Sequence, residues 1–281
     1  MIEALEFEFM RNALTAGLLT SIACGIIGTL VVLNRKVFIS AGIAHAAYGG
    51  VGLGYYLRVN PMWSALVFSL LAALGMGVVE RNTQERSDTL IGVMWAVGMA
   101  MGVILIDLTD GYKTDLMSFL FGSVLTVATS DLICMAILDL VIIVVVAIFH
   151  KELLALSFDE LFATVQNVPV ERLYYVLICM IAITVVMLMR VVGLIMVIAL
   201  LTMPAAISSI YVRDMRKMMV VASVLGMLFT TAGLWLSYTL DLTSGATIIL
   251  VATCFYFLSM ARQFRLRRIA WKGRKSSVMR S

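Results

Sequence analysis

The chain has 281 residues, of which 62% are hydrophobic and 14% are charged, and its formal net charge is +4. Its mean hydropathy of +1.03 excludes an ordinary soluble domain, because so much apolar surface must face lipid. The Lys and Arg residues cluster at the ends of apolar segments, which excludes a basic domain that binds nucleic acid. We therefore predict an all-α integral membrane protein in contact with membrane lipid.

Nine apolar segments are long enough to cross about 30 Å of hydrocarbon, which takes about 20 helical residues. They cover residues 9–33, 41–58, 62–80, 89–106, 131–149, 173–190, 193–211, 218–238 and 245–260. No soluble repeat or low-complexity linker separates them. Residues 1–281 are therefore predicted to form one transmembrane domain with about nine membrane-spanning helices.

The positively charged residues give the predicted orientation, since Lys and Arg are enriched on the cytoplasmic side of a membrane protein. With nine crossings and a cytoplasmic C-terminus, 17 of the 21 Lys and Arg residues lie inside, eight of them in a basic tail at residues 261–281. Without the tail the split is still 9 to 4. The N-terminus is therefore predicted to lie outside.

The second apolar segment contains a histidine beside a row of small residues. Gly42, Ala46, Gly50 and Gly54 recur every four residues, so one helix face is bare enough for another helix to approach closely. His45 flanks this face, and an ionisable residue at membrane depth is a candidate functional residue. We predict that the small residues pack against another helix and that His45 lies on an ion path, with a packing role as the alternative.

The connection between the fourth and fifth segments is too long for a simple turn. Its apolar middle, residues 116–127, has only a dozen residues and is too short to span the membrane. A re-entrant half-helix and an amphipathic surface loop are both consistent with this pattern.

Asp139 lies inside the apolar segment 131–149. A carboxylate at this depth needs protonation or a partner. With an imidazole it would suit a borderline divalent cation such as zinc, for which His and Asp are common ligands. A place on the ion path and a role in helix packing or partner contact are the two interpretations of Asp139.

Residues 156–170 predict a short cytoplasmic helix between two spans. Ser157 or Asp159 can cap it, and Asn167 with Pro169 ends it. An apolar stripe at helical spacing is formed by Phe158, Leu161, Phe162 and Val165. The acidic pair beside the stripe, Asp159 and Glu160, fits poorly with an anionic inner leaflet, so we favour docking on another protein over a position in the lipid headgroups.

The remaining chemistry favours transport over catalysis. Pro204 lies mid-segment, where it removes a backbone hydrogen bond and predicts a helix break. The chain contains no HExxH, GxSxG or P-loop motif, so it is not predicted to be an enzyme or to bind ATP by itself. A permease that receives its energy from another subunit fits these observations.

Four stretches of the chain form a recognisable set: VVLNRKVFISAGIAHAAYGG from Val31, LSFDELFATVQNVPV from Leu156, VGLIMVIALLTMPAAISS from Val192 and LSYTLDLTSGATIILVA from Leu236. In this order they resemble the membrane subunit of bacterial ABC importers for zinc, manganese and iron. The last two are the most specific. The resemblance implies a type II importer fold in the bacterial plasma membrane, a separate cytoplasmic ATPase that uses the ATP, an extracytoplasmic solute-binding protein, and a second copy or a paralogous permease.

The resemblance also implies roles for individual residues. Phe158, Asp159 and Ala163 match the segment that contacts the ATPase, and Asn167 stands where the family often has glycine. Many members carry an aspartate one turn before the histidine, but this chain has Ala41, so only the His45 half of that gate carries over. Loss of the oxygen ligand favours zinc as the transported ion, then manganese or iron.

No permanently bound cofactor is expected. The alternatives are an ABC permease for a metal chelate of the siderophore or cobalamin type, a secondary cation transporter, and a non-transporting membrane scaffold.

Overall fold

The computed structural model describes residues 6–83, 87–109, 120, 122 and 127–278. Within these residues the regular elements are helices, and nine of them are long and apolar enough to cross a membrane, as predicted. The membrane-spanning candidates are α1 (Glu8–Leu33), α2 (Val37–Tyr56), α3 (Pro61–Asn82), α4 (Ser87–Asp107), α6 (Thr129–Ile148), α9 (Val170–Val192), α10 (Leu194–Tyr211), α11 (Met215–Leu240) and α12 (Ser244–Val278). Two short helices, α7 (His150–Phe158) and α8 (Glu160–Val165), connect α6 to α9.

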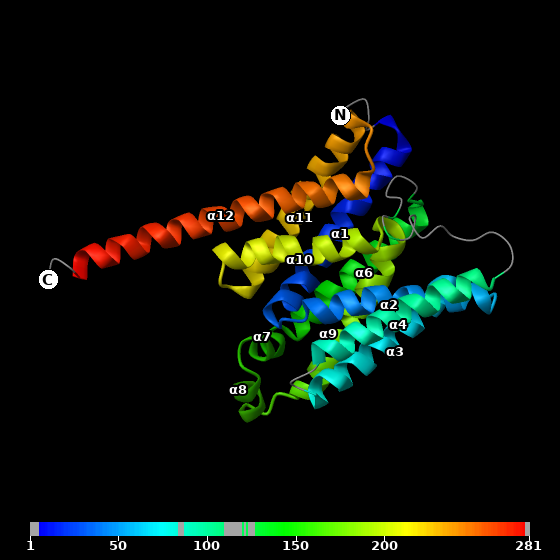
Figure 1. The fold of residues 1–281 in the computed structure, drawn as a ribbon, viewed down its shortest axis with the longest axis horizontal. Coiled ribbons are helices and arrows are strands. Elements are labelled where there is room, and N and C mark those ends of the chain that lie inside the picture. Colours follow the sequence, from blue (N-terminus) through cyan, green and yellow to red (C-terminus); the bar gives the residue numbers. More distant parts are fainter. Residues whose placement is uncertain (1–5, 84–86, 110–119, 121, 123–126, 279–281) are drawn as a thin grey trace.

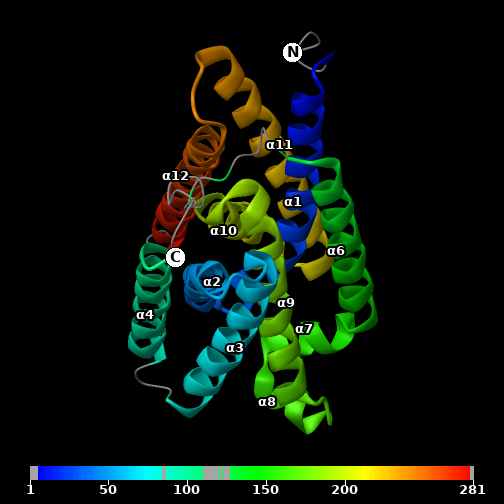
Figure 2. The ribbon, with the colours of Figure 1, turned by 90° about the vertical axis from the view of Figure 1, so that its right-hand side faces the viewer.

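The helices form a bundle with α2 enclosed near one side. It contacts α3, α4, α9 and α10, while α1 packs along α11 and α10 (Figure 1 and Figure 2). In the most apolar part of α2, 72% of the residues are buried, compared with 22% for α4 and for α12. The outer faces of α4 and α12 are therefore available to lipid or to a partner, whereas α2 belongs to the protein interior.

Two helix ends differ by four residues or more from the predicted segments. Helix α2 begins at Val37, four residues before the predicted 41, and α12 continues to Val278, far beyond the predicted 260. Hydropathy shows where a span leaves the hydrocarbon, but the Arg, Lys, Gln and Leu residues that follow still favour helix. Most of the basic tail therefore continues α12, which extends away from the bundle (Figure 1). The apolar stretch 116–127 lies almost entirely outside the described residues.

One residue joins α9 to α10. Gly193 has φ 83° and ψ 157°, a backbone conformation open essentially to glycine alone. Its N–H donates to the Met189 carbonyl at 3.0 Å, and its carbonyl accepts from the N–H of Val197 at 3.1 Å. The chain therefore ends one helix and begins the next within a single residue.

Pro204 does not end its helix. Helix α10 continues through it to Tyr211, and the proline is buried among its neighbours. Since proline lacks one N–H, only one backbone hydrogen bond is missing there. At the predicted break the helix therefore loses one backbone hydrogen bond but stays continuous, and the change of chain direction lies at Gly193.

The predicted small-residue face of α2 lies against α3 and α4. A methyl group added at Gly50 would lie 2.7 Å from Ala65 Cα, and one added at Gly54 would lie 2.6 Å from Pro61 Cα. At Gly42 the added atom would meet Met76 Sδ at 3.1 Å. These distances are shorter than van der Waals contact, so glycine allows the helix axes to approach closely.

Helix α4 supplies a second close approach that the sequence reasoning did not single out. A methyl group at Gly98 would lie 2.9 Å from Ala46 Cα, and one at Gly102 would lie 2.6 Å from the Tyr48 carbonyl oxygen. On α2, a methyl group added at Gly49 would lie 2.6 Å from the Gly98 carbonyl oxygen. The α2–α4 contact therefore brings two backbones almost together.

Candidate functional site

His45 lies half-buried on α2, with its ring turned toward α4. Its Nδ1 lies 2.8 Å from the carbonyl oxygen of Ala41, one turn earlier. Because a carbonyl can only accept, Nδ1 carries the proton and Nε2 keeps the lone pair that a metal ion would need. The ring centroid lies 4.1 Å from that of Trp95 on α4. This backbone contact orients the His45 ring and leaves Nε2 unprotonated in its neutral form.

Ala41 contributes its backbone carbonyl to this arrangement and has no side-chain ligand to offer. The side chain at position 41 therefore offers no oxygen ligand at this turn. His45 lies beside the Trp95 ring and belongs to no group of three or more His, Cys, Asp and Glu side chains in the described part of the chain.

Asp139 faces a different part of the bundle. It lies on α6, is 5% exposed, and is turned toward Cys24 on α1. Its Oδ2 has no hydrogen-bond partner among the residues that the structure describes. Because His45 is turned toward α4, the chain does not bring this carboxylate and the imidazole together.

No complete metal site is found within the described part of one chain. No group of three or more His, Cys, Asp and Glu side chains there could hold a metal ion. His45 is therefore not part of a cluster of three or more such side chains among the described residues.

The predicted coupling segment is the turn between α7 and α9. Asp159 caps α8, since its Oδ1 accepts from the N–H of Phe162 at 3.0 Å. Asn167 follows the helix with φ 58°, the left-handed conformation expected at this position. The Val168 N–H returns to the Ala163 carbonyl at 3.1 Å and closes the end of α8.

The two faces of α8 differ sharply. Ala163 is completely buried against the bundle. The apolar stripe Phe158, Leu161, Phe162 and Val165 is exposed, with Leu161 80% exposed. A cluster of exposed apolar side chains on a short connecting helix is typical of a surface that binds another protein. Ser157, the other predicted cap, instead accepts a hydrogen bond from Asn34 at 2.9 Å.

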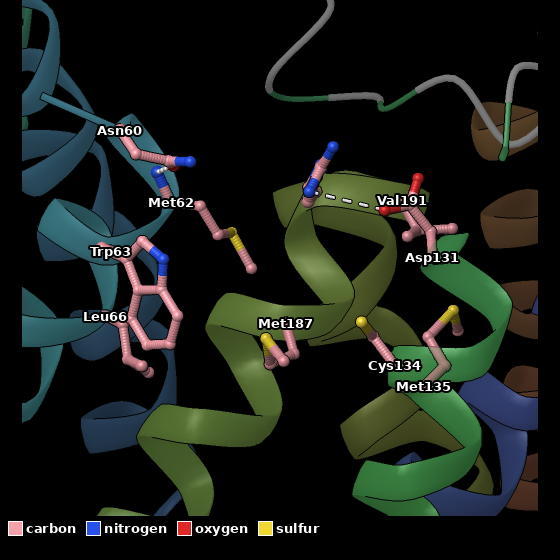
Figure 3. A pocket seen from close by; sticks show the side chains of 10 residues that line it. Asn60, Met62, Trp63, Leu66, Asp131, Cys134, Met135, Met187 and Val191 are labelled. Carbon is pink, nitrogen blue, oxygen red and sulfur yellow. Dashed lines mark hydrogen bonds and ion pairs between the residues drawn. The ribbon is translucent and has the colours of Figure 1, made fainter.

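A cavity of about 250 Å³ lies at the end of the bundle that was predicted to face outside (Figure 3). The residues that line it are Asn60, Met62, Trp63, Leu66, Asp131, Cys134, Met135, Met187, Arg190 and Val191. An ion pair of 3.4 Å between Arg190 and Asp131 crosses its edge. The other lining groups are mainly apolar, so the cavity offers no set of ligands for a cation.

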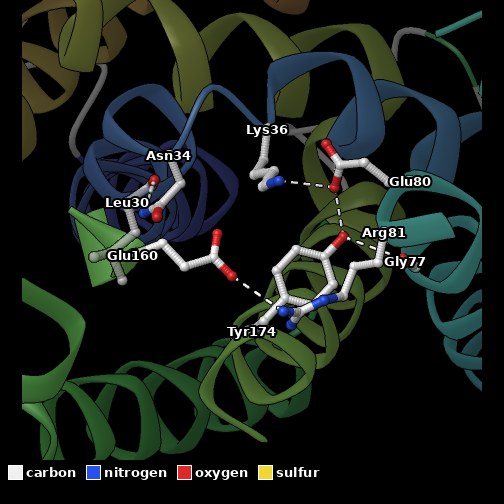
Figure 4. Close-up of polar contacts among 8 residues, drawn as sticks. All are labelled: Leu30, Asn34, Lys36, Gly77, Glu80, Arg81, Glu160 and Tyr174. Atoms are coloured by element: carbon white, nitrogen blue, oxygen red, sulfur yellow. Dashed lines mark hydrogen bonds and ion pairs between the residues drawn. The ribbon is translucent and has the colours of Figure 1, made fainter. Parts of the chain in front are cut away.

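At the end that carries α8, polar side chains from separate segments meet around Tyr174 (Figure 4). The sequence reasoning missed this cluster. Its members come from four separate segments at the ends of apolar spans, and no local spacing signals that they converge.

Comparison of the sequence with known protein families identifies the family of this chain. The sequence profile of the ABC 3 transport family matches residues 6–263. The chain belongs to this family. It is therefore a multi-pass plasma-membrane permease of a metal ABC importer, a transport subunit whose ATPase is a separate chain.

Three similar proteins match this permease over nearly all of its length. The uncharacterized membrane protein slr2045 of Synechocystis sp. is 60% identical over 93% of both chains. The manganese transport system membrane protein MntC of Listeria monocytogenes is 34% identical over 91% of both chains. The solved structure of PsaBC from Streptococcus pneumoniae in complex with Fab is 32% identical, covers 92% of this chain and 93% of that chain, and has a TM-score of 0.83.

Proposed function

We propose that this permease imports manganese, driven by ATP hydrolysis in its partner subunit. The observation that carries the proposal is the 34% identity over 91% of both chains to a permease named for manganese transport. The preference for zinc that the sequence suggested rested on Ala41 and on a possible pairing of His45 with Asp139, and it has no support from this relative. Zinc and iron become the competitors against which manganese uptake is measured.

We further propose that two permease chains enclose the metal path. One chain provides a single oriented imidazole, and manganese prefers a larger set of ligands that includes oxygen. A second copy, or a paralogous permease, would bring a second helix of the same kind, and the remaining ligands would be backbone oxygens and water. An extracytoplasmic solute-binding protein would deliver the ion, so ion choice is shared with that protein.

Helix α8 is the proposed contact with the cytoplasmic ATPase. Its exposed apolar side chains would enter a groove of the ATPase, and the cap at Asp159 with the turn at Asn167 would hold the segment in shape. The metal is substrate in this scheme, ATP is used only by the partner, and no resident cofactor is required.

The decisive experiment measures manganese uptake by vesicles that contain the permease, its ATPase and its binding protein. Replacing His45→Ala should reduce ATP-driven manganese uptake by at least ten-fold, about the effect of losing one metal ligand or its orienting group. His150→Ala is the matched control, because it alters the other of the two histidines, which contacts Arg216 at 2.8 Å. Full uptake by the His45→Ala variant would remove this residue from the path.

Competition identifies the ion. Manganese uptake that unlabelled manganese suppresses more strongly than zinc or iron would support the proposal. Stronger suppression by zinc would restore the original preference. Uptake without any ATPase subunit would contradict ATP-driven import altogether.

A further inference from the structure

Tyr174 of α9 lies between two ion pairs that belong to different segments (Figure 4). Glu80 in the last turn of α3 accepts hydrogen bonds from Lys36 Nζ at 2.7 Å and from the Tyr174 hydroxyl. The next residue, Arg81, pairs with Glu160 of α8 at 3.0 Å. The Tyr174 ring centroid lies 4.9 Å from Lys36 Nζ and 5.0 Å from Arg81 Cζ, within range of cation–π attraction to both. One aromatic side chain therefore touches both pairs.

The inner pair fixes the beginning of α2. Lys36 is the N-cap residue of that helix, a position where the helix dipole disfavours a cation. Glu80 offsets this disadvantage, and the two side chains are only 18% and 23% exposed, so water screens their attraction weakly. Through Glu80 and Tyr174, the first turn of α2 is attached to α3 and α9.

The outer pair attaches α8 more loosely. The side chains of Arg81 and Glu160 are 30% and 56% exposed, so their pairing is weaker and easily broken. A second contact supports it, because Asn34 in the turn before α2 donates to Ser157 Oγ at the end of α7. The segment formed by α7 and α8 therefore contacts this region at two points, at Arg81 beside Tyr174 and at Asn34 in the turn before α2.

We propose that Tyr174 and Glu80 are positioning residues that transmit displacement of α8 to the start of α2 and hence to His45. His45 is nine residues beyond Lys36 on the same helix, about 13 Å along its axis at 1.5 Å per residue. A rotation of the first turn is carried to His45 because α2 is enclosed and continuous. The proposal rests on the proposed function, since it takes α8 as the ATPase contact and His45 as a residue of the metal path.

The test measures metal uptake and ATP hydrolysis in the same vesicles, using the complete complex with manganese. Tyr174→Phe removes the hydroxyl that reaches Glu80 and keeps the ring. We expect the metal imported per ATP hydrolysed to fall by about five-fold or more, the lower end of ordinary coupling between two sites. A purely structural role would lower uptake and hydrolysis together and leave their ratio unchanged.

Tyr175→Phe is the matched control, because it also removes one tyrosine hydroxyl, from the next residue in the sequence. The Tyr175 ring packs edge-on against Tyr174, with the ring centroids 5.4 Å apart. This control should leave the ratio at the wild-type value. Glu80→Gln should lower the ratio as Tyr174→Phe does. Reversing the outer pair with Arg81→Glu should lower the ratio, and adding Glu160→Arg should restore it.

The outcomes separate this inference from the proposed function. A wild-type ratio in both Tyr174→Phe and Glu80→Gln, in a complex that imports manganese, would overturn the inference alone. A wild-type complex without ATP-driven uptake, or a Phe162→Asp variant that still retains the ATPase, would instead overturn the proposed function.

Discussion

The close contact between α2 and α4 gives a sharp test of the packing. Gly98 and Gly92 lie on the same helix, but a methyl group at Gly98 would lie 2.9 Å from Ala46 Cα, whereas one at Gly92 would meet Phe38 Cζ at 3.9 Å. The first distance is a steric clash with a backbone atom, which cannot move away by changing a side-chain rotamer. The second is ordinary van der Waals contact.

The difference between Gly98→Ala and Gly92→Ala isolates the cost of the collision. Both substitutions gain the same helix propensity, so this gain cancels in the comparison. Inserting a methyl group into a close-packed interface costs about 1–3 kcal/mol. Since the atoms in the way are Cα and Cβ of another helix, we expect Gly98→Ala to lie below Gly92→Ala in stability by that amount.

Thermal unfolding of the detergent-solubilised permease, followed by tryptophan fluorescence, measures the difference. At roughly 2–4 °C per kcal/mol for a chain of this size, the Tm of Gly98→Ala should fall several degrees below that of Gly92→Ala. Equal Tm values, or a higher Tm for Gly98→Ala, would show that α2 and α4 are not in backbone contact.

Two further predictions concern α8. Asp159→Ala removes the cap, which should cost about 1 kcal/mol of stability and lower the amount of ATPase that copurifies with the permease. Asp159→Asn can still accept from the Phe162 N–H and should keep the ATPase bound. Loss of the ATPase from both variants would show that the charge of Asp159, and not the cap, is needed. Asn167→Gly should be tolerated because Asn167 has φ 58°, whereas Asn167→Val should destabilise the segment by roughly 1–2 kcal/mol. The Tm and the binding of the ATPase measure the two effects. Equal values for the two variants would contradict the left-handed conformation at Asn167.

Local chemistry made α8 predictable from sequence. The cap and the end of α8 depend on side chains within a few positions, so the sequence narrowed the cap to Ser157 or Asp159 and placed the end at Asn167 with Pro169. The nine apolar segments were equally visible, because each must cross the same thickness of hydrocarbon. The end of α12 was not visible, since leaving the membrane does not end a helix.

Contacts between distant segments were beyond this reasoning. Gly98 and Gly102 show the spacing of a helix-packing pair, but nothing in their spacing identifies α2 as the partner. Trp95 is 50 residues from His45, and Tyr174 is 94 residues from Glu80. The sequence therefore predicted His45 as a candidate but could not identify what orients it, and it did not reveal the cluster around Tyr174.

The single-residue junction at Gly193 has a mechanical consequence. Most connections between helices contain several residues that can absorb a shift, but α9 and α10 are joined with no slack. The last turn of α9 and the first turn of α10 are therefore held next to each other by one residue. A side chain at position 193 would force this junction into a backbone conformation that only glycine adopts without strain.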